Sequence, residues 1–127
     1  MERKPLTKKL DKLLLQILRL RENNTCVKCG KRIKGCDSQT SHIVPKGNGA
    51  SQRRWDLLNV VLMCYRCHLG WWHKNPLDAA EWFANKYPAR NNYLRIYRGG
   101  KPMPIKTPQM ESLVEIFRQK IKEFEND

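Results

Sequence analysis

Two stretches near the ends of the chain repeat apolar residues at helical spacing. Between Leu6 and Arg21, leucine and isoleucine recur every three or four positions, and most of the basic residues fall between them. This pattern predicts an amphipathic helix with an apolar face in the core. A second stripe follows Thr107-Pro108, which is typical of a cap and first helical position, and its members are Met110, Leu113, Val114, Phe117, Ile121 and Phe124. We expect this final helix either to pack on the domain or to pair with a second chain in a homodimer.

The middle of the chain alternates short apolar runs with loop signals. Thr40–Val44 and Leu57–Met63 are β-branched or apolar, and the glycine-containing loop PKGNGASQRR separates them. This pattern predicts a two-stranded hairpin with a long loop. In CYRCHLGWWHK, ring and ligand residues recur at near-helical spacing, so a short helix is expected from the second cysteine pair onward.

We expect one domain with attached helices, because 127 residues supply one modest core. Asn75-Pro76 is typical of a cap and the first position of a helix that Pro88 ends. A further helical turn is expected over Asn91–Arg98, closed by Gly99-Gly100, and a proline-rich linker over Lys101–Lys106. The chain then divides into a basic N-terminal helix (1–24), a core (25–98), and a linker with a C-terminal helix (99–127).

Charge points to a polyanionic partner. The chain has 25 Lys and Arg against 12 Asp and Glu, a formal net charge of +13, which makes nucleic acid the leading candidate. Ribosome-like or membrane-surface binding would fit the same charge. No apolar run approaches the roughly 18 residues of a membrane span, and the N-terminus MERKPLTKK lacks the apolar stretch of a secretion signal. We therefore expect a cytoplasmic protein without a membrane partner.

Four of the five cysteines form two Cys-x-x-Cys pairs. Each spacing lets two sulfurs reach adjacent corners of one tetrahedral zinc ion; the pairs are Cys26 with Cys29 and Cys64 with Cys67. In a reducing compartment such pairs favour metal binding over disulfides. Gly30 can take the positive φ that a tight, thiolate-lined turn requires. We predict a closed, structural zinc site formed by these four cysteines, with Cys36 not among the ligands.

Ser41-His42 and Asn59 lie between the cysteine pairs, and His68 directly follows the last cysteine. The segments CVKCG, SHIVPKGNG, LLNVVLMCYRCH and WWH, which cover the middle third to half of the chain, together resemble the HNH endonuclease family. The resemblance implies an α+β fold with a small ββα-metal core and a structural zinc knuckle, flanked by N- and C-terminal helices. In that family the first His activates water, the Asn orients the loop, the last His binds a divalent ion, and the products carry 5′ phosphates.

The residue chemistry agrees with these roles. A neutral imidazole can accept a proton from water near pH 7, so His42 is the expected general base. The Asn59 amide can bridge backbone groups of the loop and restrain His42. His68, fixed by the zinc ligand Cys67, is an expected ligand of the catalytic ion, with His73 as a candidate second ligand. We expect Mg²⁺ or Mn²⁺ there, although nitrogen ligands also suit Ni²⁺ and Zn²⁺.

The chain departs from the family pattern directly before its first His. The family usually has a metal-binding Asp at the position that Ser41 occupies here. Asp37 or His73 could complete the site, or Ser41 could act on the ion through a bound water. A degenerate domain that does not cut is a further alternative.

The stretch RRWDLLNVVLMCYRCHLGWWHKNPLDAAEWF is also similar to bacteriophage HNH proteins of the NinG (Rap) recombination type. This resemblance implies a nuclease that acts on branched DNA, such as Holliday junctions or D-loops, in the host cytoplasm. Five basic residues are expected to contact phosphates without reading sequence: Lys46, Arg53, Arg54, Arg66 and Lys74. The rival functions are a nicking or packaging HNH endonuclease without junction selectivity, and a non-catalytic zinc-knuckle module that binds nucleic acid.

Overall fold

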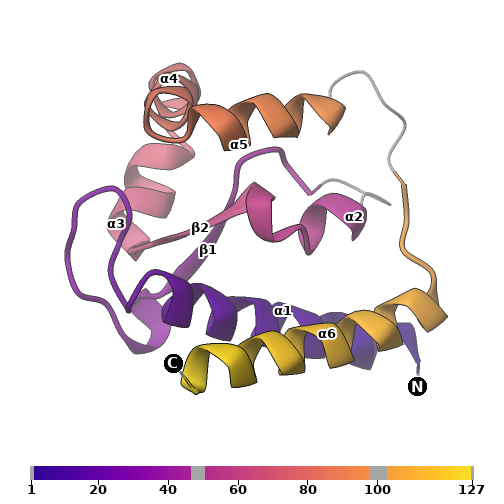
Figure 1. Ribbon diagram of the computed structural model, residues 1–127. Helices are drawn as coiled ribbons and strands as arrows, with labels where there is room; N and C mark the ends of the chain where they lie inside the picture. The colour runs from indigo at the N-terminus through magenta and orange to yellow at the C-terminus, as the bar shows by residue number, and fades with distance from the viewer. Residues whose placement is uncertain (1, 47–50, 98–102, 127) are drawn as a thin grey trace.

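The fold places a small antiparallel hairpin between two groups of helices (Figure 1). The computed structural model describes residues 2–46, 51–97 and 103–126. In chain order its elements are helix α1 (Arg3–Arg21), 3₁₀ turn η1 (Gly35–Asp37), strand β1 (Gln39–His42), helix α2 (Ser51–Arg54), 3₁₀ turn η2 (Leu57–Asn59), strand β2 (Val60–Met63), helix α3 (Tyr65–Cys67), π-helical turn η3 (His68–Trp72), helices α4 (Pro76–Lys86) and α5 (Pro88–Tyr93), 3₁₀ turn η4 (Leu94–Tyr97) and helix α6 (Thr107–Glu125). No helix in this part of the chain is long and apolar enough to cross a membrane.

Helices α1 and α6 lie side by side along one edge of the molecule (Figure 1). The apolar faces of both helices are buried, through Leu6, Leu10, Leu14, Ile17 and Leu18 of α1 and Met110, Val114, Phe117 and Ile121 of α6. The stripe expected on the C-terminal helix therefore packs within its own chain. A homodimer stays a prediction, and it would need a surface other than this stripe.

The predicted hairpin is present, with shorter strands than its apolar runs. Strands β1 and β2 pair antiparallel, with Gln39 opposite Met63 and His42 opposite Val60. Beyond His42 the Ile43 N–H still donates to the Asn59 carbonyl at 2.9 Å, and at Val44 the side chain of Asn59, rather than a partner strand, binds both backbone polar groups. All four residues of β2 are buried, so this strand lies inside the core, whereas only Ser41 of β1 is fully buried.

The helix starts differ in detail from the expected caps. Pro76 is the first residue of α4, but the Asn75 side chain caps nothing, because its Nδ2 donates to the Trp71 carbonyl at 3.1 Å. Pro88 does not simply end a helix: it begins α5, since proline suits a first helical position. The helical turn expected from Asn91 therefore starts earlier and continues through η4 to Tyr97.

The C-terminal helix begins one residue before its expected start. Lys106 occupies the cap position, and its backbone N–H donates to Gln109 Oε1 at 2.9 Å, so Thr107 is already helical. Residues 103–106 carry no helix or strand, as expected of a linker. The expected Gly99-Gly100 closure and residues 101–102 of the linker lie outside the described residues.

Two isoleucines of α6 test the packing of α6 on α1. Ile121 is 6% exposed and Ile116 is 58% exposed. We predict that Ile121→Ala lowers the free energy of unfolding by about 2 kcal/mol or more, because it leaves a cavity under the helix. Ile116→Ala, the same change on the solvent side, should alter it by no more than about 0.5 kcal/mol. Urea unfolding of the two variants measures the difference, and equal losses would contradict the packing.

Candidate active site

Four cysteines gather beside the hairpin in a geometry compatible with a structural metal such as zinc. Their sulfurs all lie within 4.8 Å of one another; they belong to Cys26, Cys29, Cys64 and Cys67. Cys29 Sγ and Cys64 Sγ are 3.9 Å apart, and two sulfurs bound tetrahedrally to zinc at 2.3 Å would be about 3.8 Å apart. Cys36 is exposed and stands outside the cluster.

The first cysteine pair lies on a tight turn that the sequence predicts correctly. Gly30 has a φ of +77°, the left-handed region that suits glycine. Its N–H donates to the Cys26 carbonyl at 2.9 Å, and the Cys26 N–H donates to the Lys31 carbonyl at 2.9 Å. Asp37 ties this turn to the second pair, since its carboxylate accepts from the Lys31 ammonium and from the Tyr65 N–H. Asp37 therefore supports the cysteine cluster and does not line the histidine cavity described below.

Neighbouring sulfurs of the cluster oppose one another's ionisation. Burial raises the pKa of Cys26, but the backbone N–H groups of Cys29, Cys64 and Lys28 outweigh it and lower that pKa to about 7. Burial and the neighbouring sulfurs raise the pKa of Cys67 well above its usual value. One thiolate thus opposes ionisation of the next, and a divalent ion would remove this repulsion. The donor set fits zinc.

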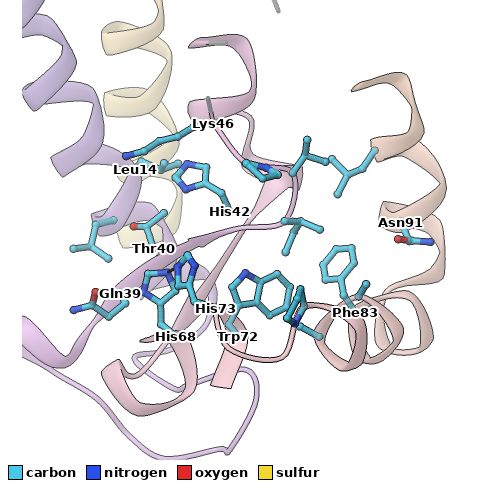
Figure 2. Close-up of a pocket in the computed structure, with 18 of the residues that line it drawn as sticks. Leu14, Gln39, Thr40, His42, Lys46, His68, Trp72, His73, Phe83 and Asn91 are labelled. Carbon is cyan, nitrogen blue, oxygen red and sulfur yellow. Dashed lines mark hydrogen bonds between the residues drawn. The ribbon is translucent and has the colours of Figure 1, made fainter. Parts of the chain in front are cut away.

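A cavity of about 850 Å³ lies against the hairpin, and all three histidines line it. Figure 2 shows His42, His68 and His73 toward one end, Phe83 toward the other, and Trp72 between them beside His73. Helices α1, α4 and α5 complete its walls. The cavity therefore brings together the three histidines that the sequence singles out.

Ser41 is not part of this cavity. Successive side chains of a strand point to opposite faces, and His42 takes the face toward the cavity. The Ser41 side chain is fully buried, and its hydroxyl has no hydrogen-bond partner. The structure therefore does not bring Ser41 to the histidines as a candidate ligand.

Asn59 joins the two ends of the loop between the strands. Its side chain is 0% exposed. Oδ1 accepts from the Val44 N–H at 2.8 Å, and Nδ2 donates to the carbonyls of Val44 at 2.9 Å and Arg53 at 3.0 Å. The amide therefore uses its acceptor and both donors within the fold, the arrangement expected of a positioning residue. Its role in catalysis stays a prediction.

The hydrogen bond of His42 determines which ring nitrogen carries the proton. His42 Nε2 lies 2.9 Å from the Arg54 carbonyl oxygen, which only accepts, so Nε2 carries the hydrogen and Nδ1 is unprotonated. Burial lowers the pKa of His42, the Arg54 carbonyl raises it, and the positive charges of Lys46 and Arg54 lower it further. The net shift is downward, so the ring is neutral near pH 7 and Nδ1 can accept a proton.

His68 and His73 meet because a π-helical turn separates them. The His73 N–H donates to the His68 carbonyl at 3.1 Å, an i to i+5 bond that places both side chains on one face. Their Nε2 atoms are 2.9 Å apart, and His68 Nδ1 is buried without a partner. Burial, reinforced by the charges of His73 and His42, lowers the pKa of His68 to about 4. His68 is therefore neutral near pH 7, and the lone pair of its one unprotonated ring nitrogen can bind a metal.

The two rings fit one metal ion but do not enclose it. Two nitrogens bound at right angles to an ion at about 2.1 Å lie about 3 Å apart, close to the observed 2.9 Å between His68 Nε2 and His73 Nε2. Across the described residues, the four cysteines are the only group of three or more His, Cys, Asp or Glu whose ligand atoms converge. No described Asp, Glu or Cys therefore joins the two histidines, which leaves positions on the ion for water or substrate.

The expected phosphate contacts divide into two groups. Lys46, Arg66 and Lys74 are exposed, and Lys46 lines the cavity. Arg53 and Arg54 instead hold the loop: Arg53 donates to the Tyr97 carbonyl at 3.2 Å, and Arg54 forms an ion pair with Asp11 at 2.5 Å. In this structure both guanidiniums bind protein groups, and their contact with phosphates stays a prediction.

Three charged residues at the site were not singled out by the sequence analysis. Arg21 donates to the carbonyls of Leu57 and Val60 at 2.7 and 2.8 Å, on either side of Asn59. Arg90 binds the Leu58 and Val60 carbonyls from α5. Asp11 accepts from the side chains of Arg54 and Trp55. Asp11 is the one acidic residue of α1, a sequence signal that could have drawn attention to it.

The cysteine cluster predicts how zinc content responds to substitution. We expect one zinc per chain in the wild type and in Cys36→Ser, whose thiol lies outside the cluster. Cys64→Ser should lose most of the bound zinc and melt at a lower temperature, because metal binding contributes directly to folding. Metal analysis and a thermal melt by circular dichroism measure both effects. Zinc retained by Cys64→Ser, or lost from Cys36→Ser, would contradict the assignment.

Comparison of the chain with protein-family models, curated protein sequences and solved structures finds no match. No relative therefore supplies a function. The case for one depends on the histidine cavity, the buried asparagine and the cysteine cluster.

Proposed function

We propose that this protein is an HNH-type endonuclease with a ββα-metal core that hydrolyses DNA phosphodiester bonds. The observation that carries the proposal is one cavity lined by a neutral His42, with Nδ1 unprotonated, and by the paired nitrogens of His68 and His73. The hairpin β1–β2 and the helical segment after it supply these residues in the order that the HNH resemblance implies. The buried Asn59 holds the connecting loop.

In this proposal each side chain has one task. His42 Nδ1 accepts the proton of the attacking water, while the Arg54 carbonyl holds the ring by its other nitrogen. Asn59 keeps the loop, and with it the Arg53–Arg54 peptide, in place. His68 and His73 hold the catalytic ion. When bound, Mg²⁺ or Mn²⁺ would neutralise charge on the phosphate and stabilise the departing 3′ oxygen, leaving a 5′ phosphate.

The absence of a carboxylate among the ligands has a consequence for metal affinity. Asp11 lines the cavity, but both its oxygens already accept hydrogen bonds from Arg54, and one also accepts from Trp55. With two histidines as its protein ligands, the ion would bind weakly to the free protein and more tightly once a substrate phosphate contributes oxygens. Imidazole also favours Mn²⁺ over Mg²⁺ in such a site.

The proposed substrate class is based on the charge of the protein and on its resemblance to NinG-type nucleases. A formal net charge of +13 and an exposed Lys46 at the cavity favour the phosphate backbone of nucleic acid. The similarity to bacteriophage NinG-type nucleases favours branched recombination intermediates. A nicking or packaging endonuclease without junction selectivity, and a zinc-knuckle module that binds without cutting, are the alternative functions.

A cleavage assay tests the proposal directly. A synthetic four-way junction, a linear duplex of the same sequence and a supercoiled plasmid are incubated with zinc-loaded protein and Mg²⁺ or Mn²⁺. We predict metal-dependent cuts with 5′ phosphates, fastest on the junction. His42→Ala should slow them by at least about 100-fold, because general-base catalysis contributes 10²- to 10⁴-fold. Ile116→Ala, at an exposed position that does not line the cavity, is the control.

The three substrates separate the alternatives. Equal rates on all three, lost in His42→Ala, would support a general nicking enzyme. Binding to DNA without cuts under either metal would refute nuclease activity and favour the binding module. Cuts that persist in a His42→Ala protein with full zinc content would refute the role assigned to His42.

A further inference from the structure

His42 and Asn59 bind consecutive carbonyls of one short segment. The Arg53 carbonyl accepts from Asn59 Nδ2 at 3.0 Å, and the Arg54 carbonyl lies 2.9 Å from His42 Nε2. The orientation of His42, and which of its nitrogens is protonated, therefore depend on where the Arg54 carbonyl lies, within the short segment Arg53–Trp55. A hydrogen bond to a ring nitrogen selects the tautomer of a histidine in this way.

Side chains of the same segment are held by Asp11 of α1. Asp11 Oδ1 accepts from Arg54 Nε and from Trp55 Nε1, both at 2.9 Å, and Oδ2 accepts from Arg54 Nη2 at 2.5 Å. The fork of the guanidinium thus meets both carboxylate oxygens, the geometry of the strongest ion pairs. Trp55 is 4% exposed, so its ring packs in the core while its N–H binds Asp11.

We propose that Asp11 is a positioning residue that fixes the tautomer and orientation of His42 through Arg54 and Trp55. Its carboxylate lies at the cavity wall, but both oxygens accept these three hydrogen bonds. Asp11 therefore acts through Arg54 and Trp55 rather than on substrate or metal. The chain of contacts runs from α1 to the Arg54 side chain, through the Arg54 backbone, to the His42 ring. Only its catalytic consequence rests on the proposed nuclease function.

Arg54 is the link that makes the proposal specific. Its charged end binds Asp11, and its backbone carbonyl binds His42. Asp11 and Arg54 should therefore act as a unit. Replacing both should lower kcat by no more than the more damaging of the two single substitutions does. Residues that act independently would give additive losses instead.

The test compares Asp11→Asn and Asp11→Ala with Asp78→Asn, which makes the same chemical change on the exposed surface of α4. An asparagine keeps the shape of Asp11, but its NH₂ cannot accept, so at least one of the three bonds is lost. The first readout is the ¹⁵N spectrum of the His42 ring in zinc-loaded protein. We expect a single Nε2–H form in the wild type and in Asp78→Asn, and a mixture with the Nδ1–H form in both Asp11 variants.

The second readout is cleavage of the four-way junction. We expect the Asp11 variants to lower kcat by about 10- to 100-fold, the usual cost of a misplaced catalytic group, with KM changed by no more than about threefold. Asp11→Asn combined with Arg54→Gln should be no slower than the more damaging single variant. Circular dichroism and zinc content confirm the fold of each variant, and Asp11→Asn decides the matter if Asp11→Ala does not fold.

Two results would overturn the proposal. One is an unchanged Nε2–H signal in correctly folded Asp11 variants, which would leave Asp11 as a purely structural contact that shifts only the melting temperature. The other is an additive loss in the Asp11→Asn/Arg54→Gln pair. A wild type that cuts no DNA would refute the nuclease function alone, because the ring spectrum still shows whether Asp11 controls His42.

Discussion

Four sulfurs from distant parts of the chain lie within 4.8 Å of one another beside the hairpin. Cys29 and Cys64 lie 35 residues apart in sequence, yet their sulfurs are 3.9 Å apart. A shared ion would tie the turn after α1 to the end of β2, where the Val27 N–H already donates to the Leu62 carbonyl at 3.0 Å. Because His68 directly follows Cys67, the same constraint places the first residue of the π-helical turn. The cluster therefore supports the histidine pair without sharing a ligand with it.

A second set of contacts positions His42. Asn59, Arg21 and Arg90 bind backbone groups at the start of β2 and in the adjoining loop, so polar groups there are held by side chains rather than by a wider sheet. Asp11 extends this arrangement to α1, and α1 is held by α6. Packing at the edge of the molecule and the chemistry proposed for the cavity are thus connected through a few charged side chains.

Local spacing in the sequence predicts some features of the structure. Contacts between segments that are distant in sequence are not predicted by it. Cysteine spacing and the alternation of apolar runs are local, and they anticipate the four-sulfur cluster and the hairpin. Asp11 meets Arg54 across 43 positions and Arg90 meets Val60 across 30, so no periodicity reports these contacts. His73 reaches His68 only because the turn is π-helical, which α-helical spacing does not suggest. Ser41 takes the buried face of a strand whose register only the folded hairpin defines.

We propose that one chain holds two separate metal sites, a closed site of four cysteines and an open site at His68 and His73. Titration of Mn²⁺ into zinc-loaded protein with a bound DNA oligonucleotide, followed by NMR, tests it most directly. We predict that the ring signals of His68 and His73 broaden first, while one zinc per chain remains, since zinc binds more tightly than manganese. Histidine signals that stay sharp at Mn²⁺ concentrations that saturate other sites, or loss of the zinc, would contradict it.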